Sequence, residues 1–396
     1  MLRFLTARES HGAALSVIVE GLPSGIALSL DQVSEDLARR RLGYGRGPRM
    51  RFERDELRFL GGVRHGRTLG SPVSIEIANS EWAKWEQEMS AAPGEPERKL
   101  TKPRPGHADL VGMQKYAFDD ARDVLERASA RETAARVAAG ALAKALLAPL
   151  GVSVVSHVVR IGSVAVPSGV RPGPHDLALV DESEVRCVDK DTEAAMIEEI
   201  KAAAKDGDSL GGIVEVIAYG VPAGLGSYVH WDRKMDGLLA GALMSIQAVK
   251  AVEIGDGIAQ AAQRGSQAHD AIALDPTAES SGGFTRKSDH AGGLEGGMTS
   301  GAPLIARVAM KPLATLNRPV LETVDLATGE STVSFKERTD VTAVPALGVV
   351  AEAMMALVIA NEALRKFGGD SLEEFTRNHA QYVQHLGSSA SRSRPA

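Results

Sequence analysis

Three short segments of the chain carry residue types suited to acid–base chemistry. His11 follows Ser10 near the N-terminus, His107 lies in a stiff turn after a proline-rich stretch, and Asp340 follows Arg338 in the C-terminal quarter. Imidazole and carboxylate groups are the commonest proton donors and acceptors in enzymes. These residues are candidates for catalysis, although a single histidine or an Arg–Asp pair is more often structural.

An arginine-rich segment lies between Arg39 and Arg67. It holds ten arginines, no lysine and three acidic residues, within a chain whose net charge is −6. Guanidinium groups bind phosphates and carboxylates through paired hydrogen bonds, and the glycines at 43, 45 and 47 make part of the segment flexible. The segment predicts a site for a small anion, with a solvated basic surface as the alternative. Nucleic acid is disfavoured because aromatic residues are few here and the rest of the chain is acidic.

Glycine is unusually frequent and is concentrated in one place. The chain has 41 glycines in 396 residues, about one in ten against a usual ~7%, and five of them lie within residues 292–301. Such density indicates backbone held close to another group, often a flat ring or a phosphate. A long flexible loop is the alternative.

Composition and missing motifs exclude several classes of protein. The single cysteine, Cys187, excludes a disulfide framework and a cysteine-ligated zinc site, and we expect it in the core. The sequence has no Walker A loop, no dinucleotide-binding glycine motif and no HExxH motif, so no metal site is expected. Residues 8–12 resemble part of a serine-hydrolase nucleophile elbow, but Arg8 replaces the first glycine, which makes Ser10 a weak candidate nucleophile. The N-terminus has no secretory apolar region and the apolar run at 353–360 is too short to span a bilayer, so a cytoplasmic protein without a membrane partner is expected.

Groups of strands and Ala-rich helices must position these residues. The sequence predicts strands at 14–20, 57–61, 73–78, 152–161, 213–219, 304–311 and 332–336. It predicts helices from a capping box at Ser129 and Glu132 through residue 150, over 236–252, and over 349–367. Because strands come in groups, we expect an α+β fold with antiparallel sheets. Residues 87–105 are predicted as an exposed loop and residues 386–396 as a disordered tail.

Taken together, these segments resemble the chorismate synthase family. The motifs that match occur in the family's order over about residues 1–375, at 9–12, 39–47, 64–66, 104–109, 125–133, 211–215, 224–227, 292–301 and 311–312. The resemblance implies one intertwined α+β domain over residues 1–385, where length alone also allows two domains. It implies a phosphate-lyase that converts 5-enolpyruvylshikimate 3-phosphate to chorismate by anti 1,4-elimination, the last common step of the shikimate pathway.

The resemblance also implies a cofactor and an assembly. Reduced FMN is required although the reaction has no net redox change, and NADPH or an external flavin reductase supplies the electrons. The family forms homotetramers. A polyanion-binding protein and a serine hydrolase remain the alternatives from other classes.

Individual roles follow by matching residues to the family's motifs. His11 is expected to protonate the departing phosphate, His107 to stabilise the reduced flavin near N1, and Asp340 to act through flavin N5 in removing the C6 proton. Ser10 and Ser129 are expected in the same site.

Two further sets are expected to bind the cofactor and the anions. The residues expected to line FMN are Arg127, Ala128, Ser129, Gln247, Ala248, Gly296, Lys311, Pro312, Leu313, Ala314, Thr315 and Arg338. The residues expected to hold anionic groups of the substrate or NADPH are Arg40, Arg46 and Arg49. The chain departs from the family's usual residues at Arg8 (glycine), Thr339 (histidine or serine), Ala302 (glutamine) and the Asp289–His290 pair.

Overall fold

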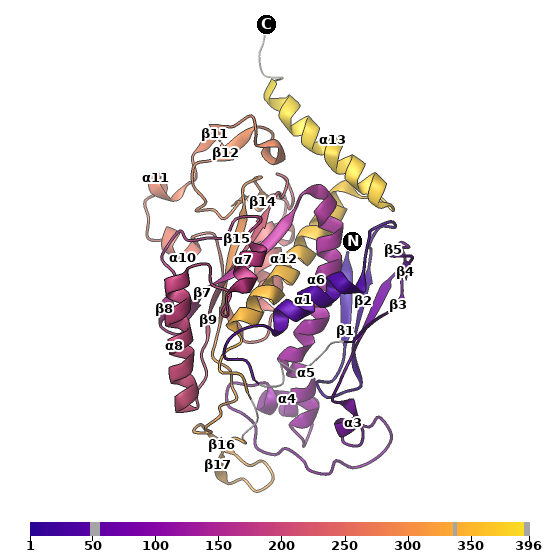
Figure 1. Ribbon diagram of the computed structural model, residues 1–396, viewed down its shortest axis with the longest axis vertical. Coiled ribbons are helices and arrows are strands. Elements are labelled where there is room, and N and C mark those ends of the chain that lie inside the picture. Colours follow the sequence, from indigo (N-terminus) through magenta and orange to yellow (C-terminus); the bar gives the residue numbers. More distant parts are fainter. Residues whose placement is uncertain (48–55, 336–338, 392–396) are drawn as a thin grey trace.

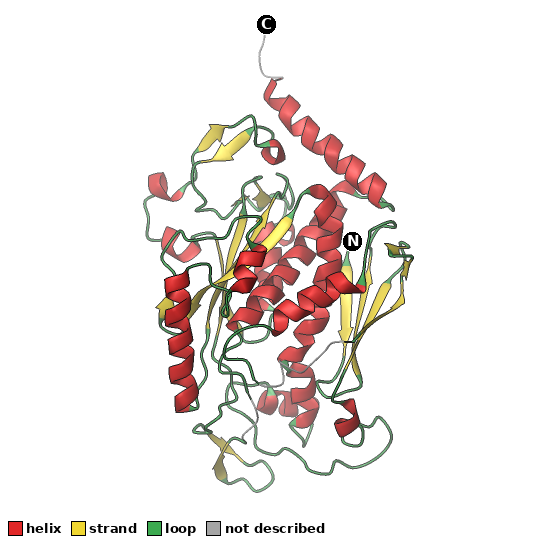
Figure 2. Cartoon of the chain, viewed as in Figure 1, coloured by secondary structure: helices red, strands yellow, loops and turns green. Residues whose placement is uncertain are grey.

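Two antiparallel sheets enclose a central group of helices (Figures 1 and 2). The computed structural model describes residues 1–47, 56–335 and 339–391. The first sheet has the order β1 (Arg3–Ala7), β2 (Ala14–Glu20), β6 (Val73–Ala78), β3 (Leu57–Gly61). The second has the order β10 (Val249–Ile254), β15 (Leu304–Met310), β9 (Gly212–Tyr219), β7 (Ser153–Ile161), β8 (Val164–Ala165).

Three helices fill the space between the sheets. They are α1 (Leu30–Arg41), α6 (Thr133–Leu147) and α12 (Val344–Phe367). Helix α6 packs on β2, α12 packs on β7 and β9, and the two helices pack on each other. Their close approach depends on Gly140, because a Cβ there would lie 2.3 Å from the Cβ of Ala353. Buried apolar residues from both sheets and all three helices form one continuous core.

Shorter elements surround this frame. The remaining helices are α3 (Trp82–Trp85), α4 (Asp109–Tyr116), α5 (Arg122–Ala128), α7 (Leu177–Glu182), α8 (Lys190–Asp206), α9 (Met235–Met244), α10 (Gly257–Gln260), α11 (Gly265–Ala268) and α13 (Leu372–Ser391). The 3-10 turns are η1 (Ala130–Glu132), η2 (Ala148–Leu150), η3 (Trp231–Arg233) and η4 (Glu279–Ser281). Within the described ranges, small strand pairs are formed by β4 (Val63–Arg64) with β5 (Arg67–Thr68), β11 (Ile272–Leu274) with β12 (Phe284–Arg286), β13 (Leu294–Glu295) with β14 (Met298–Thr299), and β16 (Glu322–Val324) with β17 (Ser331–Val333).

The predicted α+β class with antiparallel sheets is confirmed. Strands β2, β3 and β6 have the predicted bounds, because their apolar residues alternate or cluster as a half-buried sheet requires. The helix predicted over 236–252 was wrong in its second half. Helix α9 ends at Met244, Ala248 adopts a positive φ of 65°, and residues 249–254 pair with β15 instead.

Helix α13 runs to Ser391 and so includes residues 386–391 of the tail for which disorder is predicted. Leu386 contacts η4: a Cβ added to Gly282 would lie 2.9 Å from the Cβ of Leu386. That contact lies at Leu386, the first residue of the predicted tail. The predicted loop at 87–105 contains no helix or strand, although it ends at the buried Pro103 and Arg104.

Two helical stretches, Arg122–Leu150 and Val344–Phe367, have the length and apolar composition of a membrane span. Both apolar windows are mostly buried inside the protein. Their composition is therefore that of core helices between the two sheets.

Candidate active site

His11 is held by a buried carboxylate. It lies between β1 and β2, and its Nδ1 is 2.8 Å from Oε1 of Glu126 on α5. The backbone N–H of His11 donates to the other oxygen of the same carboxylate at 2.8 Å. Burial alone would raise the pKa of Glu126, but the hydrogen bonds and charge of His11 lower it. This two-point contact fixes the imidazole and leaves Nε2 for proton exchange.

An aromatic ring covers the same imidazole. Trp85, the last residue of α3, has its ring 3.9 Å from that of His11. The guanidinium of Arg122 lies 5.1 Å from the Trp85 ring and pairs with Glu126 at 3.3 Å. The C-terminal end of α3 therefore packs against His11.

The two predicted serines are adjacent. The hydroxyls of Ser10 and Ser129 are 3.2 Å apart. Ser129 caps η1 by accepting from the N–H of Arg131 at 3.3 Å, but the reciprocal half of the predicted capping box is not formed. Glu132 instead accepts from Thr6 at 2.9 Å and from Gln247 at 3.0 Å.

Arg40 reaches the same place from the end of α1. Its Nε donates to the hydroxyl of Thr133 at 2.8 Å and its Nη2 to the carbonyl of Ala130 at 3.1 Å. Arg40, a predicted anion-binding residue, thus contacts the backbone at Ala130, the residue that follows Ser129.

His107 is held by a second buried carboxylate. Its Nδ1 pairs with Asp109, which also accepts from Nε of Arg104 at 2.8 Å. Burial opposes ionisation of Asp109, but the hydrogen bonds from His107 and Arg104 lower its pKa well below the usual value. Arg104 also donates to the Thr315 hydroxyl at 3.1 Å, and Lys311 donates to the carbonyl of Gly106.

Predicted flavin-lining residues connect the two histidine regions. Gln247 contacts Glu132 on the His11 side, and the carbonyl of Ala248 accepts from the backbone N–H of Lys311 at 3.0 Å. The Ser209 hydroxyl donates to the carbonyl of Leu313 at 2.8 Å, and a Cβ at Gly106 would lie 3.8 Å from that of Ala314. Segments far apart in sequence therefore meet along one continuous path.

Asp340 and the arginine-rich loop also meet. The Asp340 carboxylate accepts from the N–H of Gly47 at 2.6 Å and lies 3.2 Å from Nε of Arg46. The predicted Arg49 and Arg338 lie outside the described residues. Arg127 is exposed, and its Nη2 donates to the carbonyl and hydroxyl of Thr6 at 3.1 and 3.0 Å.

Comparison with known proteins decides the family. A family model described as chorismate synthase matches residues 2–364. The chain belongs to the chorismate synthase family. It is 60% identical over 395 residues to a chorismate synthase of Frankia casuarinae, covering 98% of this chain and 99% of the relative. It is 57% identical over 396 residues to that of Thermobifida fusca, with the same shares covered. A crystal structure of a chorismate synthase matches with a TM-score of 0.78 at 39% identity, covering 98% of both chains.

Membership in the chorismate synthase family also gives the activity. The chain is a carbon–oxygen lyase that acts on a small-molecule phosphate and forms chorismate in the shikimate pathway of aromatic biosynthesis. This decides against the polyanion-binding and serine-hydrolase alternatives. Ser10 has a second serine, Ser129, within hydrogen-bond distance, whereas a hydrolase nucleophile requires a base.

The glycine-rich motif of the chorismate synthase family forms the β13–β14 hairpin and its flanks. Most of its glycines are needed for contacts within the protein: a Cβ at Gly297 would lie 2.6 Å from Cγ of Lys234, and one at Gly293 would lie 2.3 Å from the carbonyl oxygen of Pro303. Gly296, at φ +60°, has open space around it. Of this motif, Gly296 is the glycine whose missing side chain leaves room for a ligand.

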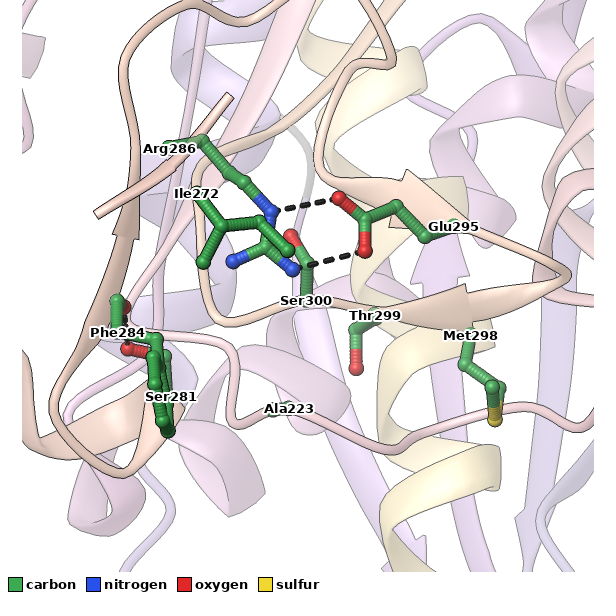
Figure 3. A pocket seen from close by; sticks show the side chains of 9 residues that line it. All are labelled: Ala223, Ile272, Ser281, Phe284, Arg286, Glu295, Met298, Thr299 and Ser300. Atoms are coloured by element: carbon green, nitrogen blue, oxygen red, sulfur yellow. Dashed lines mark hydrogen bonds and ion pairs between the residues drawn. The ribbon is translucent and has the colours of Figure 1, made fainter. Parts of the chain in front are cut away.

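A pocket lies beside this hairpin. Figure 3 shows its lining, in which Arg286 donates to Glu295 at 2.6 and 2.8 Å. Its described lining residues are Ala223, Ile272, Ser281, Phe284, Arg286, Glu295, Met298, Thr299 and Ser300. None of these is a predicted catalytic or flavin residue, although Glu295 and Met298 flank the turn that carries Gly296.

Sequence reasoning missed the residues that hold the predicted ones in place. Glu126 lies inside a family motif, but nothing in its spacing pairs it with His11, 115 positions away. Trp85 and Glu132 likewise act across long sequence separations. The described residues contain no cluster of three or more His, Cys, Asp or Glu side chains able to hold a metal ion.

Proposed function

We propose that the chain converts 5-enolpyruvylshikimate 3-phosphate to chorismate by anti 1,4-elimination, with reduced FMN bound between its two histidine regions. One observation carries this proposal. His11 and His107 are each held by a buried carboxylate, and the path between them runs through Gln247, Ala248 and Lys311. Acid–base groups thus stand at both ends of a row of predicted flavin residues.

The residues present fit a flavin. Oε1 of Gln247 is buried without a hydrogen-bond partner, as expected of a group that pairs with a ring N–H. Gly296 leaves open space, and Lys311 and Arg127 supply positive charge. The residues that would hold FMN are Arg127, Ala128, Ser129, Gln247, Ala248, Gly296, Lys311, Pro312, Leu313, Ala314, Thr315 and Arg338. When bound, reduced FMN supplies transient electron density while phosphate leaves.

His11 is the proposed acid for the departing phosphate. Glu126 accepts from its Nδ1, so Nε2 is the atom that gives up the proton. The hydroxyls of Ser10 and Ser129 lie beside it, within hydrogen-bond distance of each other. Arg40, Arg46 and Arg49 would hold the anionic groups of the substrate or of NADPH.

Asp340 is the proposed acceptor of the C6 proton. Gly47 and Arg46 hold its carboxylate at 2.6 and 3.2 Å, which fixes its orientation. His107, next to the Gly106 carbonyl that binds Lys311, is proposed to lie against the flavin and stabilise its reduced form.

The proposal also covers the location of the enzyme, its electron source and its assembly. We place the enzyme in the cytoplasm, with NADPH or an external flavin reductase as the electron source, and as a homotetramer. Support for self-association comes from Tyr228, Val229 and Trp231, which are 71%, 65% and 77% exposed around η3. Light scattering of the purified chain tests the assembly: a monomer at all concentrations would contradict it.

An anaerobic assay tests the reaction. Chorismate should form from 5-enolpyruvylshikimate 3-phosphate when FMN and a reductant are both present, and not when either is omitted. Running the assay with NADPH, with dithionite and with an added flavin reductase identifies the electron source. Folded protein that gives no chorismate with dithionite-reduced FMN would contradict the proposal.

The Asp340→Asn variant tests the proton acceptor. Turnover should fall by about 10²-fold or more, as for the loss of a general base. Asp119→Asn is the matched control and should keep full turnover, because the Asp119 side chain is 78% exposed and pairs with Lys99 away from the proposed site. Unchanged turnover in Asp340→Asn would remove the role of that carboxylate but not the chorismate synthase activity.

A further inference from the structure

Arg8 is a buried cation at the edge of the serine pair. It follows β1, two residues before Ser10, and only 5% of it is exposed. Its Nη2 donates to the carbonyl of Ser129 at 2.6 Å and to that of Arg127 at 3.4 Å. The guanidinium therefore rests on the turn between α5 and η1, where the Ser129 hydroxyl faces that of Ser10.

Two of the three nitrogens of Arg8 have no partner. Nε and Nη1 are buried and make no hydrogen bond, although buried N–H donors are nearly always paired and leaving one unpaired is costly. The contacts of Nη2 are to carbonyls, which are neutral. Arg8 thus has spare N–H donors and no carboxylate hydrogen-bonded to it, although the charges of Glu132 and Glu126 act on it from nearby.

A second guanidinium approaches the same turn. Arg40 donates to the carbonyl of Ala130, the residue after the one whose carbonyl binds Arg8. Burial, together with the charges of Arg127 and Arg40, lowers the pKa of Arg8 to about 10, against the opposing effect of Glu132 and Glu126. Arg8 still stays protonated at neutral pH. Cations gathered in this way are complementary to an anion with several acceptor oxygens.

We propose that Arg8 is a phosphate-binding residue, whose spare N–H donors bind the phosphate of the substrate beside Ser10, Ser129 and His11. The chemistry fits a phosphate monoester, whose oxygens accept from hydroxyl, imidazole and guanidinium donors together. This inference rests on the proposed function for the identity of the substrate. The phosphate site itself follows from the burial of Arg8, its hydrogen bonds to carbonyls and its unpaired donors, whichever substrate carries the phosphate.

Binding measurements test this role separately from turnover. Calorimetric titrations would use wild-type protein, Arg8→Met, Arg8→Lys and Arg3→Ala, without reductant so that no turnover occurs. Each protein is titrated with inorganic phosphate, with oxidised FMN, and with 5-enolpyruvylshikimate 3-phosphate in the presence of oxidised FMN. Arg3→Ala is the matched control, because Arg3 lies on the adjacent strand, 76% of its side chain is exposed and it pairs with Glu20.

Arg8→Met should raise the Kd for inorganic phosphate and for the substrate about 10- to 100-fold, as for the loss of hydrogen bonds to a charged group. The Kd for oxidised FMN should stay within twofold of wild type. Arg8→Lys, which keeps the charge but not the fork, should give an intermediate Kd. Arg3→Ala should bind all three ligands like wild type.

Three results would overturn the proposal. A lowered Tm of Arg8→Met with unchanged Kd values would make Arg8 only a support for the Arg127 and Ser129 carbonyls. A loss confined to FMN would assign the guanidinium to the flavin phosphate instead. Equal Kd values for Arg8→Lys and wild type would show that the N–H fork has no role. Absence of chorismate formation would overturn the proposed function and leave the phosphate titration to decide on Arg8.

Discussion

Two neighbouring regions of buried charge are built in opposite ways, and adjacent arginines of α1 enter each of them. Arg39 enters the Glu352 cluster, defined here as Glu352 with the groups that contact it. It donates to both oxygens of Glu352 at 2.8 Å, to Asp36 at 2.8 Å and to Asp181 at 2.6 Å. Arg40 enters the serine-pair region, where it and Arg8 donate to carbonyl and hydroxyl oxygens.

The Glu352 cluster contains its own counter-charges. The fully buried Glu352 also accepts from Lys144 at 3.0 Å, Arg186 at 3.0 Å and Ser156 at 2.7 Å. Burial opposes its ionisation, but the charges of Arg39, Lys144 and Arg186 lower its pKa well below the usual value. The cluster joins α1, α6, α12 and β7, so its charges serve the packing of the helices.

In the serine-pair region Arg8 donates to carbonyls, whereas the nearby carboxylates of Glu126 and Glu132 bind His11 and Gln247. Hydrogen bonds to carbonyls orient Arg8 without cancelling its charge. The comparison of Arg39 with Arg8 gives a testable distinction: an arginine fixed by carboxylates holds the fold, whereas Arg8, fixed by carbonyls, has N–H donors left for a ligand. The predictions below test whether stability and ligand binding separate along this line.

Glu352→Gln should have the largest effect. It leaves Arg39, Lys144 and Arg186 without the fully buried carboxylate that they share, and breaking a buried ion pair in this way costs about 3–5 kcal/mol of the free energy of unfolding. Urea denaturation followed by circular dichroism measures it, with the exposed Glu20→Gln as the control. A loss below about 1 kcal/mol would show that the cluster does not hold the helices together.

Arg40→Met should separate ligand binding from stability. Without Arg40 the Ala130 carbonyl keeps a hydrogen-bond partner, because the Thr133 hydroxyl still donates to it at 2.6 Å. The KM for 5-enolpyruvylshikimate 3-phosphate should rise about 10- to 100-fold, with a change in unfolding free energy below about 1 kcal/mol. Arg39→Met is the control and should show the reverse, a loss of stability of about 3 kcal/mol. Similar losses of unfolding free energy in both variants would contradict the separation of ligand binding from stability between Arg40 and Arg39.

Lowering the pH should weaken the interactions of ionised carboxylates, because these groups become protonated, whereas the arginines stay charged. Glu215 illustrates the sign: burial opposes its ionisation, but His157, Arg171 and Arg307 lower its pKa from 4.5 to about 2. A group whose pKa is lower in the folded state stabilises the fold above its unfolded pKa. That stability is lost as the pH falls from about 4.5 to about 2, by up to about 3 kcal/mol. Urea midpoints measured from pH 7 to pH 2.5 should be flat above pH 5.5 and fall below it, and Glu215→Gln should reduce that fall.

Local sequence patterns revealed some elements of the fold and hid others. Strand β6 was predictable because Val73, Ile75 and Ile77 alternate with more exposed residues. Helix α1 was missed because its last turn, with Arg39, Arg40 and Arg41, is indistinguishable in composition from a basic loop. In the structure these arginines sit at the helix C-terminus, where the helix dipole favours cations.

The site residues likewise fall into those that family motifs identify and those that depend on contacts made by the folded chain. Family motifs pointed to His11, whereas the partner Glu126 depends on a contact that only the folded chain makes. Arg8 was visible in the sequence as a departure from the family. Its significance lies in burial and unpaired donors, which composition and spacing do not encode.

Ser29→Ala should have the smallest effect, and it tests whether the Glu352 cluster positions Arg40. Ser29 caps α1 by accepting from the N–H of Gln32 at 3.2 Å, and the Gln32 side chain accepts in return from the N–H of Ser29 at 3.0 Å. Losing this cap should lower the free energy of unfolding by about 1 kcal/mol. The opposite end of α1 is clamped by Arg39, so the first turn can fray without moving Arg40, and the KM for the substrate should stay within twofold of wild type. Steady-state kinetics and urea denaturation on the same preparation measure both quantities. A rise in KM as large as that of Arg40→Met would mean that the helix as a whole, rather than the cluster at its end, holds Arg40 in place.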